Sequence, residues 1–247
     1  MTLNRQAASE TARIVHRIPV LLAFLIVPSY VLAATPTPKQ TYLHYPTGVG
    51  AYEWGSAIGV TLDILSPRLI ESEQRFVPRL TGAFRYGFPA GFSLEASLDA
   101  IVLVNELRMG LQWSINTGPV AWALHDRLGL WFGYIGVDGF DTHAVGLIQY
   151  PGASVGTIIA GHHLSLTFEV ILVHAQRVDF GDASVSRTNT AYGGFSLRLL
   201  LESPVGPGVL YYGATFFQAS PDYQLWLAFS DGRRKVQFVR FHLGYEL

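Results

Sequence analysis

From residue 51 to the end of the chain, hydrophobic and polar side chains alternate over long stretches. The clearest case is the final stretch, 239–247, where Val239, Phe241 and Leu243 take alternate positions around Arg240 and its polar neighbours. A period of two places successive side chains on opposite faces of a β-strand. The pattern therefore predicts a strand with one apolar and one polar face that continues to the end of the sequence.

Nine further segments show the same alternation, so we expect an all-β chain of ten antiparallel strands. Twelve strands is the alternative, because 143–150, 153–160 and 223–230 are each compatible with a separate short strand. The predicted strands lie within 51–66, 75–88, 92–99, 107–115, 120–134, 143–157, 164–172 and 195–202, in a ninth segment beginning at 209, and in 239–247. Short turns are expected at one end of the strands, and longer loops at the other end, at 66–74, 137–142, 176–189 and 220–233.

The two faces decide what kind of barrel these strands would form. A soluble barrel is polar outside and apolar inside, whereas a membrane barrel has the reverse arrangement. Only 14% of the residues are charged and 49% are hydrophobic, and the polar face consists largely of Gly, Ala, Ser and Thr. Such a face is a poor covering for a water-exposed surface, which carries about 25–35% charged residues. We therefore predict an antiparallel up-and-down transmembrane β-barrel with its hydrophobic face outward.

The dimensions and the aromatic residues agree with a membrane barrel. An apolar face of about 11 residues spans ~28 Å at a ~3.3 Å rise and ~40° tilt, close to the ~25 Å apolar band of such barrels. Aromatic side chains also gather at one predicted height, near the short turns, as expected for an interface girdle. The predicted girdle residues are Trp54, Phe88, Phe92, Trp113, Trp122, Tyr211 and Tyr245.

The first 34 residues are typical of a secretory signal. Arg5, Arg13 and Arg17 precede the apolar stretch 18–32, and small residues follow at Ala33 and Ala34. Cleavage there would remove three arginines and one glutamate, leaving 14 basic and 17 acidic residues and a net charge of −3. We thus predict a signal peptide at 1–34, a periplasmic linker at 35–50, and an outer-membrane barrel at 51–247.

The final strand resembles the C-terminal signature of bacterial outer-membrane proteins. Apolar residues take alternate positions and Tyr245 is third from the end, although Leu247 stands where that class usually has an aromatic residue. The resemblance implies insertion into a Gram-negative outer membrane, with both termini in the periplasm. It also implies contact with outer-membrane lipid and with the barrel-assembly machinery through the last strand. It names no activity and no oligomeric state.

The polar face carries a pattern of charges in which neighbouring strands tend to oppose acid with base. The working hypothesis is a narrow, porin-like passive pore for small solutes or ions, lined by these charges. The alternative is a closed barrel with a salt-bridged interior and a structural or surface-interaction role. In either case we expect the arginines of 75–88 to pair with acids on both flanks. The predicted lumen charge network comprises Glu53, Asp63, Arg75, Arg79, Arg85, Glu95, Asp99, Arg108, Arg127, Glu169, Arg198, Glu202 and Arg240.

One short motif suggests lipid esterase chemistry. His163 and Ser165 have the His-x-Ser spacing of outer-membrane phospholipases A and lipid A deacylases, but their parity predicts a lumen-facing position, whereas the dyad of those families faces lipid. The supporting Asn or Glu is also absent. We therefore expect no enzyme, with a lipid esterase as a remote alternative. The sequence shows no cofactor or metal motif, and no basic stripe for nucleic acid.

Overall fold

The computed structural model describes residues 41–64, 76–101, 104–137, 140–219 and 236–247. The predicted signal peptide lies outside these residues. They belong to one compact unit, Lys39–Leu247. Within them, no helix has the length and hydropathy needed to cross a membrane.

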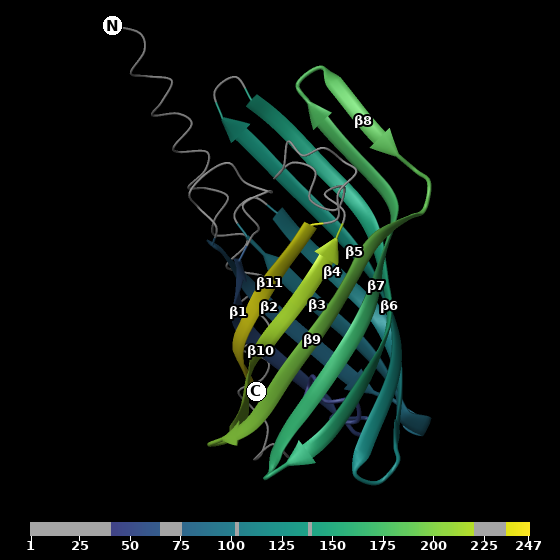
Figure 1. Ribbon diagram of the computed structural model, residues 1–247, viewed down its shortest axis with the longest axis vertical. Helices are drawn as coiled ribbons and strands as arrows, with labels where there is room; N and C mark the ends of the chain where they lie inside the picture. Colours follow the sequence, from purple (N-terminus) through teal and green to yellow (C-terminus); the bar gives the residue numbers. More distant parts are fainter. Residues whose placement is uncertain (1–40, 65–75, 102–103, 138–139, 220–235) are drawn as a thin grey trace, which may run out of the picture. The chain divides into compact units, whose positions relative to one another are not determined.

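The described chain is almost entirely β-structure, as Figure 1 shows. A single 3₁₀ turn, η2 (Pro89–Gly91), joins the second and third strands. The strands are β1 (Trp54–Ile64), β2 (Phe76–Gly87), β3 (Phe92–Ala100), β4 (Val104–Asn116), β5 (Val120–Val137), β6 (Phe140–Ile159), β7 (His162–Phe180), β8 (Ala183–Arg187), β9 (Ala191–Val205), β10 (Gly208–Ala219) and β11 (Val236–Glu246).

Ten of these strands form a closed antiparallel barrel, which confirms the predicted fold and strand number. Each strand pairs with its neighbours in the order β6-β5-β4-β3-β2-β1-β11-β10-β9-β7, and β6 pairs with β7 to close the ring. The last strand pairs with the first along its length, from Ala57 opposite Glu246 to Ile64 opposite Val239. Closure leaves no sheet edge, so the final strand stays ordered to its end.

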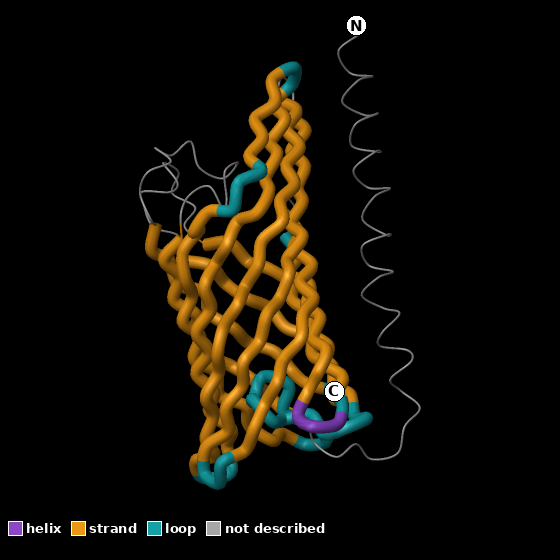
Figure 2. Tube along the Cα trace, turned by 90° about the vertical axis from the view of Figure 1, so that its right-hand side faces the viewer, coloured by secondary structure: helices purple, strands orange, loops and turns teal. Residues whose placement is uncertain are grey.

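The strands β5, β6 and β7 are longer than the alternation predicts. They have 18, 20 and 19 residues, and they extend beyond the other strands in Figures 1 and 2, where β7 also pairs with the short outer strand β8. The predicted loops 137–142 and 176–189 are therefore largely strand. Residues 143–159 lie in one continuous strand, β6, rather than in two short strands, whereas 223–230 lies outside the described residues.

The two faces of the wall differ as the alternation predicts. Large apolar side chains point outward, and Leu62, Leu111 and Leu197 are 37%, 58% and 40% exposed to a water-sized probe. Polar side chains of the opposite parity are buried in the lumen, including Asp63, which is fully covered, and Arg79. Apolar side chains also enter the lumen at the end where β10 stops and β11 starts, and there they form one cluster.

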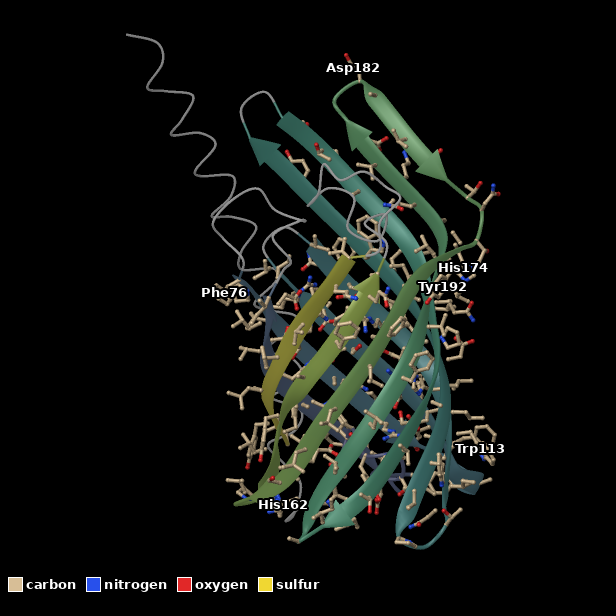
Figure 3. The ribbon with its side chains drawn as sticks, viewed as in Figure 1. Phe76, Trp113, His162, His174, Asp182 and Tyr192 are labelled. Carbon is tan, nitrogen blue, oxygen red and sulfur yellow. The ribbon has the colours of Figure 1, made fainter. Side chains whose placement is uncertain are left out.

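Most of the aromatic side chains predicted for the girdle point outward from the wall. Trp54, Phe88, Phe92, Trp113 and Trp122 are all exposed outward, and Trp113 is labelled on the wall in Figure 3. Tyr245 shares its parity with outward Phe241 and Leu243.

Tyr211 instead lies in the lumen and is 4% exposed, while its neighbour Tyr212 points outward. Two adjacent tyrosines leave the parity of this strand open in the sequence. The lumen has room for the Tyr211 side chain, because Gly244 lies opposite Tyr211 and Gly59 packs against the same ring. A Cβ added at Gly244 would lie 2.3 Å from the Tyr211 ring and hydroxyl.

Candidate functional site

The lumen begins, at the short-turn end, with residues 41–50, which the sequence analysis places in a linker. These residues instead fold into a compact turn among the barrel side chains. The amide of Tyr45 donates to the carbonyl of Tyr42, and the amide of Gly48 donates to the carbonyl of Tyr45. Leu43 and Tyr45 are buried. We call residues 41–50 the lumen segment.

Arg85 holds the lumen segment through its backbone. Its guanidinium donates to the carbonyls of Leu43, Tyr45 and Pro46 at 3.0, 2.8 and 3.0 Å. Gln112 donates to the same Pro46 carbonyl at 2.8 Å. The fork of donors in arginine suits several carbonyls at once, and a buried carbonyl without a donor is costly. The segment is therefore fixed by strands β2 and β4.

Two buried carboxylates hold the amides of the same segment. The Leu43 amide donates to Glu246 at 2.9 Å, and the His44 amide donates to Glu202 at 2.7 Å. Aromatic contacts add to this attachment, since the ring of Tyr42 stacks on His163 with centroids 3.6 Å apart. Strands from both halves of the barrel thus contact the lumen segment.

Above the segment lies a first ion-pair network centred on Arg127. Its guanidinium contacts Glu95 at 2.6 Å and Glu169 at 2.8 Å. Glu95 also lies 3.4 Å from Arg85, and Glu169 lies 3.4 Å from His125. Each buried charge therefore faces an opposite one, which offsets part of its desolvation cost.

A second network starts at Asp63, which contacts Arg79 at 2.8 Å and also pairs with Arg240. It continues through Asp99, which lies 3.6 Å from Arg240 and 3.6 Å from Arg108. Arg108 in turn contacts Glu106 at 2.6 Å. The hydroxyl of Tyr150 makes a short hydrogen bond to Glu106. This chain of charges crosses the lumen between β11 and β6.

The apolar cluster closes the lumen beyond these charges. Phe217 and Phe238 stack with centroids 4.5 Å apart, and Trp131, Ile148 and Ile171 are buried beside them. Between this cluster and the lumen segment, a cavity of about 60 Å³ remains next to His44 and the arginines. Such a volume holds a few water molecules at most. Buried side chains therefore occupy much of the described interior.

The structure places the predicted lumen residues as follows. Arg75 lies outside the described residues. Glu53 accepts a hydrogen bond from the Gly50 amide at 3.1 Å, and Arg198 lines the small cavity. The other predicted residues take part in the ion pairs and anchors described above: Asp63, Arg79, Arg85, Glu95, Asp99, Arg108, Arg127, Glu169, Glu202 and Arg240.

Sequence reasoning missed several partners that the structure brings into the lumen. Glu106 and Glu246 share the polar parity of Arg108 and Arg240, so strict use of parity would have found both. The roles of His125 and Gln112 could not be read, because each depends on a strand or segment elsewhere in the sequence. The missed residues are Glu106, Gln112, His125, Tyr150 and Glu246.

His163 and Ser165 both face the lumen. Ser165 is 2% exposed, and His163 packs between the rings of Tyr42 and Tyr45. In the described part of the chain no hydrogen bond joins the two side chains, and His162 rather than His163 contacts a serine, Ser203, at 2.9 Å. The geometry gives this motif no catalytic pair.

Comparison with known proteins gives no family. No family model matches the chain, and no curated protein matches it. Similar solved structures include Ail, the attachment invasion locus protein of Yersinia pestis (12% identity, 78% of this chain and 97% of that chain, TM-score 0.35). Others are the translocator domain of the autotransporter NalP from Neisseria meningitidis (10%, 93% and 95%, 0.36) and LpxR from Salmonella typhimurium (8%, 76% and 99%, 0.30). TM-scores this low support no functional comparison.

The barrel's own wall decides the class of protein. Outward Leu, Phe and Trp side chains cover the strands, while buried charges and serines fill the lumen. A water-soluble barrel with this wall would expose far more apolar surface than soluble proteins carry in one patch. The chain is a membrane β-barrel. The ten-stranded ring has no free edge, which is what lipid requires of a spanning β-sheet.

Proposed function

We propose that this membrane barrel is exported to the outer membrane of a Gram-negative bacterium and works there as a closed barrel, not as a passive pore. The closed interior is the observation that carries the proposal. In the described residues, the lumen segment, two ion-pair networks and an apolar cluster occupy the interior, and the cavity beside His44 has a volume of about 60 Å³. Barrels of about eight strands are filled by side chains, whereas about 16–18 strands leave an aqueous channel.

The resemblance of the last strand to the outer-membrane signature supports this location, and so does the predicted signal peptide at 1–34 with its apolar stretch 18–32. On this proposal the short turns and both termini face the periplasm, and the extended β5–β8 region faces the outside. A closed barrel contributes through its wall and its outer surface. Outer-membrane lipid is then its first partner, and the barrel-assembly machinery acts on the chain during insertion.

Conductance separates the closed barrel from a pore. The mature protein, folded in detergent and added to a planar lipid bilayer, should give no steady unitary current steps, with an open porin in the same bilayer as the positive control. A variant that lacks residues 41–50 should stay silent too, since the ion pairs and the apolar cluster remain. Steady steps from the unaltered protein would refute the closed barrel and restore the narrow pore.

A further inference from the structure

Four polar side chains form a continuous chain of hydrogen bonds on the outside of the barrel. Asp126 accepts from Gln149 Nε2 at 2.7 Å, and Gln149 Oε1 lies 2.8 Å from His174 Nε2. The other ring nitrogen, His174 Nδ1, lies 2.9 Å from the hydroxyl of Thr190. The residues come from β5, β6, β7 and the turn before β9.

The position of this chain on the wall is unusual. Asp126 shares the outward parity of Trp122, Leu124 and Leu128 and is exposed. Asp126 lies four residues beyond Trp122 along β5. At ~2.5 Å of height per residue this is ~10 Å above the level of Trp122, which is within the ~25 Å apolar band. Ionisable residues at such depth are costly and mark functional sites.

The opposite end of the chain lies close to the edge of the band. Val155 on β6 pairs with Trp122, and Gln149 lies six residues further along β6. Gln149 pairs with Leu172 on β7, and His174 lies two residues beyond Leu172. At ~2.5 Å of height per residue, His174 therefore lies ~20 Å above the level of Trp122. Figure 3 shows His174 and Tyr192 together on the upper wall, well above Trp113. Acyl esters of membrane lipids lie at this boundary, because they join the polar headgroup to the acyl chains.

Hydrogen-bond chemistry fixes the direction of every link. Gln149 Nε2 donates to Asp126 Oδ2, so the amide turns its oxygen to His174. That oxygen needs a donor, so His174 carries its proton on Nε2. Nδ1 is then the acceptor for the Thr190 hydroxyl proton. This arrangement is a hydroxyl nucleophile beside a base, with the base oriented by a third group.

The geometry points to a lipid-facing acyl-ester hydrolase site in which Thr190 is the nucleophile and His174 is the general base. Gln149 and Asp126 are positioning residues that set the tautomer of His174. The substrate class is a membrane lipid that carries a carboxylic ester. The site lies on the outer wall, so it operates on a barrel with a closed lumen and goes beyond the function proposed above.

The reaction balances without a cofactor. Thr190 Oγ1 bonds to the ester carbonyl carbon while its proton passes to His174 Nδ1. The bond from that carbon to the alcohol oxygen breaks, and His174 returns the proton to the departing alcohol, which leaves an acyl-threonine. A water molecule then attacks the acyl-threonine, again losing its proton to His174, and the proton is returned to Thr190 as the fatty acid leaves.

The wall around the site suits a lipid. Outward Leu130, Leu147 and Tyr192, which are 45%, 38% and 48% exposed, offer an apolar track for the acyl chain. Three residues further along β7, Arg177 borders a hollow of about 430 Å³ on the outer face. A hollow of this size fits the head of a lipid, since ligand sites measure about 300–1,000 Å³.

His143 and Asp179 also line the hollow, beside Phe132 and Tyr134. The ring of Tyr134 lies 4.6 Å from that of His143, and Arg177 contacts Asp179 at 3.0 Å. The hollow therefore combines aromatic walls with both signs of charge. It lies on the same outward face as the Thr190–His174 pair.

Fatty-acid release from lipid in mixed micelles tests the site. One arm uses dioleoylphosphatidylglycerol and the other uses purified lipid A, which separates glycerophospholipid from lipopolysaccharide esters. We expect the unaltered barrel to release fatty acid in one arm. Thr190→Ala and His174→Asn should each lose about 100-fold in rate, the scale of a general base. Thr190→Ser restores a hydroxyl and should recover part of the rate lost in Thr190→Ala, whereas the neighbouring Thr188→Ala should leave the rate unchanged.

The positioning residues need a separate readout. Asp126→Asn keeps an acceptor for Gln149 and should stay within about threefold of the unaltered rate, while Asp126→Leu should lower kcat roughly tenfold with KM unchanged. Folding of each variant is checked by its electrophoretic shift without heating. No release in either arm from the folded barrel, or release that survives both Thr190→Ala and His174→Asn, would overturn the site. Neither result bears on the conductance test of the closed lumen.

Discussion

At the scale of single residues, alternation predicts which face of the wall a side chain occupies but not which residue it contacts. The parity of Asp63, Arg79 and Arg240 predicts three lumen charges, and the structure joins them in one contact set. Tyr211 shows where parity fails, because the adjacent Tyr212 fits the outer wall equally well in the sequence. The room left by Gly244 settles the choice.

Removal of the shared carboxylate should cost more than removal of one arginine. Asp63→Ala takes the close carboxylate from both Arg79 and Arg240, so we expect a loss of about 3–5 kcal/mol in unfolding free energy. Arg79→Ala leaves Asp63 with Arg240 and should cost about 1–3 kcal/mol. Urea unfolding of the detergent-folded barrel measures both, with Asp182→Asn, at the exposed hairpin tip labelled in Figure 3, as the control. Equal losses from the two variants would argue against a shared carboxylate.

The fit of Tyr211 against Gly244 gives a second residue-scale prediction. Gly244→Ala should destabilise the barrel by about 1–3 kcal/mol, because the new Cβ meets the tyrosine ring. The double variant with Tyr211→Leu should recover part of this loss, which the same unfolding measurement reports as a coupling energy. Gly82→Ala is the matched control, since a Cβ there meets nothing within 4 Å. Additive losses would show that the two residues do not interact.

At the scale of elements, the sequence predicts the strands better than their ends. The ten strands follow from alternation, but Gly152 and Pro151 obscure the length of β6. The register also shifts at Leu147/Ile148, between β6 and β7, and at Ile171/Leu172, between β7 and β9. Residues 41–50 show no strand or helix pattern. Their fold depends on donors and acceptors from distant strands, which no local pattern reveals.

The lumen segment should loosen when Arg85 is replaced. Arg85→Met removes the donors to three carbonyls, so amide hydrogen exchange at Tyr45 and Gly48 should become at least about tenfold faster. Arg198→Met is the control, because it removes a second arginine from the same cavity. Unchanged exchange in Arg85→Met would mean that other contacts suffice to hold the segment.

At the scale of the whole molecule, the faces of the wall were predictable and the external polar chain was not. Asp126, Gln149, His174 and Thr190 are spread over four segments, and only the register and the bulge beside His174 bring them together. Asp126 was the one local sign, because it is a charge on an otherwise apolar parity. The contents of the lumen likewise required the three-dimensional arrangement.

The apolar wall gives a prediction for the molecule as a whole in lipid. Leu128→Arg places a charge near the middle of the apolar band and should lower the unfolding free energy in vesicles by about 2–4 kcal/mol. Tyr134→Arg, six residues further along the same outward face, should cost only about 0–1 kcal/mol. Equal and small effects at both depths would contradict a membrane-embedded wall.

The anchoring of the lumen segment has a consequence for assembly. Arg85 on β2 can hold the segment early, but Glu202 and Glu246 belong to β9 and to the last strand. The hydrogen bonds of the lumen segment are therefore complete only when the last strand is in place. A chain cut before β11 would lack both the seam and the acceptor for the Leu43 amide, so an unfinished barrel would present an open edge and an incompletely held N-terminal segment to proteases at the same time. The addition of β11 closes the open edge and at the same time supplies Glu246 to the lumen segment.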